Sequence, residues 1–311
     1  MLWRRKKKAF EFAVYDDGET WTTVPPAKPS RTWLHILLFV LTVLSTMFAG
    51  AMQKGVNPFV HPHKILYGLP FSGMLLLILG VHEFGHYFAS RIWNVKATLP
   101  YFIPFPSPIG TIGAFIKIKS PIPNRKALID IGAAGPLLGS VVALGVLIVG
   151  LRTSAVVPVD PDSGRIVLGY SLLSYALSRV VVHAPEGYDI LFNSVALAGW
   201  LGLFVTALNL LPIGQLDGGH IVYSLFGRRH SIIGRIAIFS LFPLSIFWPG
   251  WLLWAFLTIA LGRGHPPPYD FHSPLDRKRQ LIGVLSILVF VLCFIPVPFH
   301  SPGTSPYELW R

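Results

Sequence analysis

The stretch VHEFGHYFAS (residues 81–90) places two histidines and a glutamate within one of the most apolar segments of the chain. On a helix, residues four positions apart lie on one face, so His82 and His86 can offer two ring nitrogens to one tetrahedral zinc ion. Glu83 lies beside them and can take a proton from a metal-bound water. Ser90 lies one turn further along the same face. This stretch therefore predicts an apolar helix with one polar, metal-binding face.

The alternative to a metal site is a chance match, because His-Glu-x-x-His is a short motif. The apolar setting favours the metal site, since ionisable side chains in a membrane-spanning segment are costly and by default functional. A structural polar cluster would more often use Ser, Thr or Asn than two histidines and a glutamate.

The composition is typical of a multi-span membrane protein: 52% of the 311 residues are hydrophobic, 13% are charged, and the mean hydropathy is +0.58. The net charge of +12 comes mostly from short segments between apolar runs. No basic helix with base-reading side chains stands out, so we expect no nucleic-acid partner. The basic start, MLWRRKKKAFEF, lacks a following apolar core and is not expected to be a cleaved signal peptide.

The apolar runs predict an all-α protein with about six to seven transmembrane helices. The expected spans are 33–52, about 66–93, 129–151, 190–212, 231–262 and about 280–297. The run 231–262 is interrupted by two prolines and is interpreted as a hairpin of two short helices, with one kinked helix as the alternative. We expect a cytoplasmic arm at 1–32, a membrane domain at 33–298 with a catalytic core at about 66–225, and a tail at 299–311.

Residues 94–128 are rich in proline and glycine and are apolar without a helical pattern. Every second residue from Ile112 to Ile118 is aliphatic, and this period of two predicts a short β-strand or re-entrant region near 108–122. The alternative is an ordinary hairpin over the cytoplasmic face.

Two histidines leave zinc under-coordinated, so a third protein ligand is expected. The best candidate is Asp217 in NLLPIGQLDGGH (residues 209–220), because no basic residue before Arg228 can pair with it. One alternative is that Asp217 caps a helix that begins near Gly218, and another is that His220 is the third ligand. Asn209 is interpreted as a neutral donor near the site, or as part of an interhelical hydrogen bond.

The two motifs, HEFGH and NLLPIGQLDGGH, together resemble the site-2 protease family of intramembrane zinc metalloproteases. The resemblance covers most of residues 66–225. It implies that one Zn²⁺ is held by His82, His86 and Asp217 and that Glu83 activates water. Asn209 and Pro212 match the family's second motif.

The resemblance also implies hydrolysis of a peptide bond in or near a transmembrane segment of a substrate protein. The stretch GTIGAFIKIKS looks like the family's membrane-inserted strand region, where Gly113 and Phe115 would contact a substrate that pairs with the strand edge. The loop 152–189 is too short for a PDZ domain, so we expect a compact form without that domain or a C-terminal regulatory domain.

The basic arm predicts a cytoplasmic N-terminus, and a bacterial cell membrane is expected. The lipid bilayer and a transmembrane substrate are the expected partners, while the pattern indicates no oligomeric state. The alternative function is a non-proteolytic membrane protein, either a metal transporter or a catalytically silent relative that binds membrane partners.

Overall fold

The computed structural model describes residues 32–158, 167–185, 187–261, 268–270 and 273–300. It also describes the backbone of two short paired strands, β1 (Ala13–Asp16) and β2 (Thr20–Thr23). Most of the arm expected at 1–32 and of the tail expected at 299–311 lies outside the described residues. Only β1, β2 and Thr32 of the arm, and Phe299 and His300 of the tail, are described.

Three helices in the described part are long and apolar enough to cross a membrane. They are α1 (Thr32–Gln53), α2 (Leu69–Ile92, preceded by the 3-10 helix η1, Pro62–Gly68) and α3 (Arg125–Arg152). They match the first three expected spans. α3 begins one turn earlier than expected because the Asn124 side chain accepts the Ala127 backbone N–H at 2.9 Å, which caps the helix.

The remaining helices are shorter, so the expected count of six to seven spans is not confirmed. They are α4 (Leu172–Val181), α5 (Ser194–Asn209), α6 (Asp217–Phe226), η2 (Gly227–Arg229), α7 (His230–Leu244), α8 (Gly250–Leu261) and α9 (Arg277–Cys293). The fourth expected span is shorter in the structure, where it is α5. The helix starts later than expected because the Asn193 side chain caps it by accepting the backbone N–H groups of Val195 and Ala196. The run 231–262 forms two helices, α7 and α8, which pack together as the hairpin interpretation predicted.

Four two-stranded sheets accompany the helices in the part of the chain that the structure describes. β3 (Tyr101–Pro104) pairs antiparallel with β4 (Thr111–Phe115), which confirms a strand in the proline-rich region. A bulge follows Ile103, and Gly113 in β4 has a φ of +114° that disfavours other residues. β5 (Ala155–Pro158) pairs with β7 (Tyr188–Leu191), and β6 (Val167–Leu168) with β8 (Phe299–His300).

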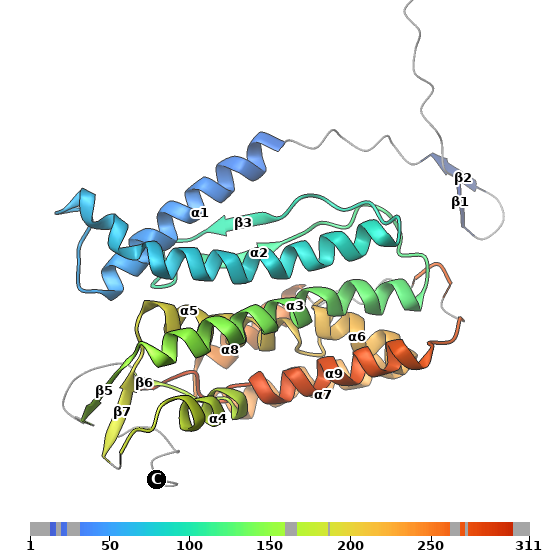
Figure 1. Cartoon of the computed structure of the whole chain (residues 1–311). Coiled ribbons are helices and arrows are strands. Elements are labelled where there is room, and N and C mark those ends of the chain that lie inside the picture. The colour runs from blue at the N-terminus through green and yellow to red at the C-terminus, as the bar shows by residue number, and fades with distance from the viewer. Residues whose placement is uncertain are drawn as a thin grey trace, which may run out of the picture.

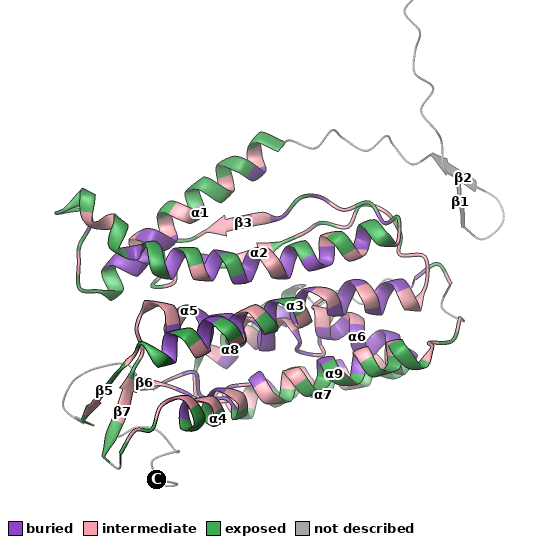
Figure 2. Cartoon of the chain, viewed as in Figure 1, coloured by how far each residue is buried: buried purple, intermediate pink, exposed green. Residues whose placement is uncertain are grey.

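The helices are stacked side by side in one bundle. α1, the β3–β4 hairpin and α2 form one side, α3 follows, and the other helices lie beyond it (Figure 1). α3 is central because it packs closely on both α2 and α5. Buried residues gather on the helix faces that meet, while exposed residues cover the outer faces, including much of α1 (Figure 2). An apolar exterior of this kind suits a protein surrounded by lipid.

Candidate active site

The side chains of the HEFGH motif lie in the second half of α2 and face inward. His82, Glu83 and His86 are all buried, with 4%, 5% and 6% of their surfaces exposed. The two imidazole rings lie 4.9 Å apart, centre to centre, as expected for helix neighbours at positions i and i+4. α2 therefore presents the three titratable groups on one buried face.

Asp217 meets this face from the far end of the sequence. Its Oδ2 atom lies 3.2 Å from Nε2 of His82 and 3.3 Å from Nε2 of His86. Within the described residues these three side chains form the one group that can hold a metal ion, with ligand atoms within 4.8 Å of one another. His220, the rival third ligand, lines the same cavity but is not part of this group.

Asp217 is the first residue of α6, but it does not cap the helix. The N-cap position is Leu216, and no side chain makes a capping hydrogen bond there. The alternative interpretation of Asp217 as a cap is therefore wrong. Tight packing explains the glycines that follow, because a Cβ at Gly218 would lie 2.0 Å from the Leu210 carbonyl oxygen. The glycines let the chain turn closely enough to bring the carboxylate to α2.

A second hydrogen bond orients His86. Its Nδ1 atom lies 2.7 Å from the backbone carbonyl oxygen of Ile131 in α3. A carbonyl can only accept, so Nδ1 carries the hydrogen and Nε2 is the ring nitrogen that can bind a metal. Two imidazoles and a carboxylate that converge in this way are a donor set for a metal cation. The donor set of two nitrogens and one oxygen fits zinc with one position left open.

Glycines of α3 make room for the imidazole rings. A Cβ at Gly139 would lie 3.1 Å from the His82 ring, and one at Gly132 would lie 2.9 Å from the His220 side chain. On the other side, a Cβ at Gly85 would lie 2.8 Å from the Ala134 carbonyl oxygen, so α2 and α3 touch through their backbones. The small residues of GAAGPLLGS (residues 132–140) thus make room for the histidine side chains and also let the helices pack closely.

A cavity of about 200 Å³ opens at this group. β4 and the residues after it form one wall, and the Ile116 backbone approaches the Glu83 carboxylate. The other walls come from α2, α3 and the turn into α6. The lining includes Ala114, Phe115, Ile116, Ile118, Ile131, Gly132, Asn209, Gln215 and Leu216.

The remaining expected residues lie at different places. The Nδ2 atom of Asn209 is 3.3 Å from Nε2 of His82, so Asn209 lies within the site and also bridges two helices. Phe115 lines the cavity, whereas Gly113 is at the bulge and does not. Ser90 is fully buried and does not line the cavity, and its hydroxyl has no hydrogen-bond partner among the described residues.

Two contributors have no signal in the sequence. The Ile131 carbonyl is a backbone group, so no residue type marks it, and nothing in its motif marks Gln215 as a cavity residue. The run of small residues that contains Gly135 and Gly139 is a sequence pattern typical of close helix packing, and it does not by itself indicate contact with the histidines.

Comparisons with known proteins agree with this geometry. The profile of peptidase family M50 matches residues 70–244. The chain is 30% identical over 285 residues to the probable zinc metalloprotease EGY2, chloroplastic, of Arabidopsis thaliana, covering 88% of this chain and 50% of that protein. It is also 30% identical over 303 residues to EGY1, chloroplastic, of the same plant, covering 86% of this chain and 54% of the relative.

The chain thus spans about half the length of the curated relatives it matches. Their names place these relatives in chloroplasts, so the expectation of a bacterial cell membrane has no support from them. The family profile covers both motifs and the cavity between them. The chain therefore belongs to peptidase family M50, the site-2 protease family that its two motifs resemble.

Proposed function

We propose that this protein is an intramembrane zinc endopeptidase that hydrolyses peptide bonds in or near the transmembrane segments of other proteins. The observation that carries the proposal is the convergence of His82, His86 and Asp217 beside Glu83, in a cavity between apolar helices. The names of the relatives, probable zinc metalloproteases, support the same activity.

The three ligands would hold one Zn²⁺ per chain. When bound, the ion supplies Lewis acidity that makes water a nucleophile at neutral pH and polarises the substrate carbonyl. The Ile131 carbonyl keeps the His86 ring in the orientation and tautomer that a ligand needs.

Glu83 acts as general base and then as general acid. It takes a proton from the attacking water and delivers it to the amide nitrogen as the C–N bond breaks, which leaves a carboxylic acid and an amine. Asn209, next to His82, offers an amide N–H to the oxygen that gains negative charge. Burial keeps bulk water away from these groups.

The substrate would bind as an added strand on the edge of β4. This edge is not paired with any described strand, and the residues that follow it line the cavity. A peptide bond inside a helix is shielded by its own hydrogen bonds, so an unwound segment must be held open. Phe115, half exposed in the cavity wall, would contact its side chains.

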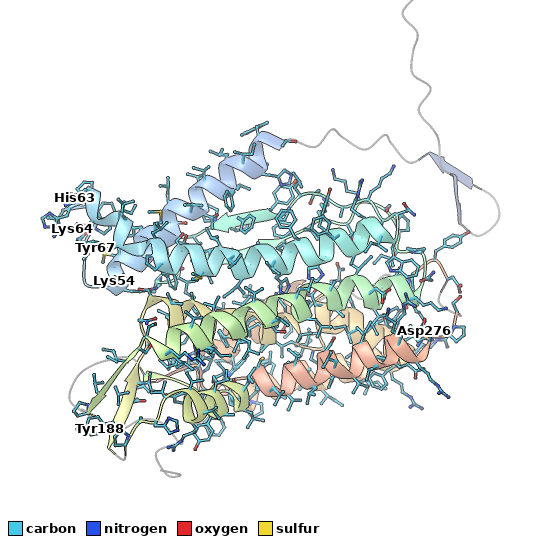
Figure 3. The ribbon with its side chains drawn as sticks, in the orientation of Figure 1. Lys54, His63, Lys64, Tyr67, Tyr188 and Asp276 are labelled. Atoms are coloured by element: carbon cyan, nitrogen blue, oxygen red, sulfur yellow. The ribbon has the colours of Figure 1, made fainter. Side chains whose placement is uncertain are left out.

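The orientation in the membrane follows from the positive charges. Asp276, at the start of α9, lies at the end of the bundle opposite to Lys54 and Tyr188 (Figure 3). The basic residues Arg125, Lys126, Arg277 and Lys278 begin α3 and α9 at the Asp276 end. We assign this end to the cytoplasmic side, which places the HEFGH half of α2 towards the cytoplasm.

The test measures zinc content and cleavage of a model transmembrane substrate in proteoliposomes. Glu83→Ala should keep about one zinc per chain and lose cleavage by about 10²–10⁴-fold. Asp217→Ala should lose both. Gly80→Ala is the matched control on α2, because a Cβ there meets nothing within 4 Å.

Unchanged cleavage by Glu83→Ala would contradict the mechanism. Zinc binding by the wild type without cleavage of any transmembrane substrate would instead support the alternative function, a metal transporter or a silent relative that binds membrane partners.

A further inference from the structure

A second cavity lies at the Asp276 end of the bundle, away from the metal group. Its volume is about 440 Å³, larger than the cavity at the histidines. It lies where the end of α6, the start of α3 and the first turns of α9 come together. Its lining residues are Arg125, Leu225, Phe226, Pro274, Leu275, Gln280, Val284 and Ile287. No residue of the metal group contributes to it.

One wall of this cavity follows α9 and is mostly apolar. Gln280, Val284 and Ile287 follow one face of α9, with the polar residue at the start of the helix and the apolar residues deeper. Phe226 and Val284 are 47% and 59% exposed, so the groove opens sideways to the outer surface of the bundle. In a membrane protein this surface faces acyl chains.

Basic residues line this cavity or neighbour its lining residues in the chain. Arg125 lines it directly and donates from Nε and Nη2 to the Ser224 carbonyl oxygen, at 3.0 and 2.5 Å. Five further basic residues are near lining residues in the chain. Lys126 follows Arg125, Arg228 and Arg229 follow Phe226, and Arg277 and Lys278 precede Gln280. All of these but Lys126 are exposed.

Nearby carboxylates are already engaged. Arg279 pairs with Asp130 at 2.8 Å and with Asp276. The pKa of the Asp276 carboxyl lies below its usual value, first because the carboxylate accepts the Arg279 backbone N–H and in smaller part because Lys126 is close. Asp270 accepts a hydrogen bond from the Ser273 hydroxyl. Among the described residues at this end of the bundle, basic side chains therefore outnumber carboxylates, which favours an anion there.

We propose that this groove binds an anionic phospholipid. The phosphate lies by Arg125 and by Arg277, which is one turn before Gln280 on the same face of α9, and one acyl chain lies along Val284 and Ile287. An apolar groove that begins under a cluster of cations at a helix start matches a charged headgroup above an acyl chain. A free phosphate would leave the apolar wall unfilled, and a neutral lipid would bring no net negative charge to the basic residues.

The test is native mass spectrometry of the purified full chain, released from nanodiscs that contain equal amounts of phosphatidylglycerol and phosphatidylcholine with the same acyl chains. The wild type should retain phosphatidylglycerol preferentially. Arg277→Ala should weaken its retention by roughly fivefold and leave phosphatidylcholine unchanged. Lys54→Ala, at the opposite end of the bundle, is the matched charge control (Figure 3).

Val284→Trp fills the groove and should abolish the preference, whereas Leu288→Trp, on an exposed part of α9 outside the lining, should not. Equal losses in these two variants, or equal retention of the two lipids by the wild type, would overturn the proposal. So would displacement of the lipid by millimolar inorganic phosphate, or a wild-type mass that shows a second protein chain in place of lipid. Arg125 is left unchanged because it also holds the end of α6.

Discussion

The imidazole of His86 lies directly against the α-carbon of Gly135, so that a Cβ at position 135 would come within 2.1 Å of Nε2. No rotamer of a larger residue avoids this contact, because the Cβ itself is the clashing atom. The glycine of α3 thus sets how close the metal-binding face of α2 can approach, and with it the distance from His86 to Asp217.

Gly135→Ala should therefore remove bound zinc and cleavage together, since the ring must move away from Asp217. Overpacking of this kind costs about 1–3 kcal/mol of stability. Zinc content, cleavage and the unfolding midpoint measure the three effects. A Cβ at Gly145 on the same helix would meet nothing within 4 Å, so Gly145→Ala should lower neither zinc content, nor cleavage, nor the unfolding midpoint. Normal zinc binding by Gly135→Ala would show that the packing is looser than described.

Zinc should stabilise the folded chain through its three ligands independently of catalysis. A metal at a hundred times its dissociation constant adds about 2.7 kcal/mol when it binds only the folded state. Thermal unfolding in detergent should shift upwards with added zinc for the wild type and for Glu83→Gln, and a chelator should reverse the shift. Asp217→Ala should show no shift, and an undiminished shift in that variant would rule out Asp217 as a ligand.

The backbone of Ile118 should contribute to substrate binding. Ile118 forms a β-bridge with Ala97. On either side of this bridge, Thr98 N–H donates to the Lys117 carbonyl oxygen and Lys119 N–H donates to the Lys96 carbonyl oxygen. The N–H and C=O groups of Ile118 itself therefore point the other way, to the cavity side. Ile118→Pro removes one outward donor, worth about 1 kcal/mol. Cleavage assays should therefore show kcat/KM reduced roughly fivefold, mainly through a higher KM.

Zinc content should be unchanged in Ile118→Pro, which separates lost substrate pairing from a damaged metal site. Ile118→Val keeps the N–H group and should behave as the wild type. If the proline variant cleaves as well as the valine variant, the substrate does not pair with this edge.

Arg279 should hold the starts of α3 and α9 and the end of α2 together. It pairs with Asp130 at 2.8 Å and lies over the Trp93 ring at 5.3 Å, and Trp93 donates to Asp130 at 3.0 Å. Arg279→Ala leaves the partly buried Asp130 without its charged partner, which costs about 1–3 kcal/mol. Thermal unfolding should detect the loss.

Arg277→Ala removes an exposed arginine two residues away and should change the free energy of unfolding by no more than about 0.5 kcal/mol. The double variant Asp130→Asn, Arg279→Ala should lose less than the sum of its single variants, because both act on one pair. Strict additivity would mean that the pair is not coupled.

The proposed orientation can be tested by cysteine accessibility. The chain has one cysteine, Cys293, which is buried, so Cys293→Ser gives a cysteine-free background. In sealed vesicles, a membrane-impermeant maleimide should reach Lys278→Cys from the cytoplasmic side only and Lys54→Cys from the other side only. The reverse pattern would invert the proposed orientation of the HEFGH half of α2.

Local patterns in the sequence were enough for the long elements. The first three apolar runs predict α1, α2 and α3 because hydropathy and length decide a spanning helix almost alone. The alternation from Ile112 to Ile118 likewise predicts a strand, and β4 lies there. The shorter helices were less predictable, since the length of α5 depends on the Asn193 cap and on the strand before it.

By itself the sequence determined which side chains are suited to bind a metal, because two histidines four residues apart must share a helix face. It also singled out Asp217 as a carboxylate that needs a partner. Only the tertiary structure decided that Asp217 reaches His82 across 135 residues, at 3.2 Å. That distance depends on glycines at helix contacts and on a backbone carbonyl of Ile131, and such contacts arise only when separate helices pack together.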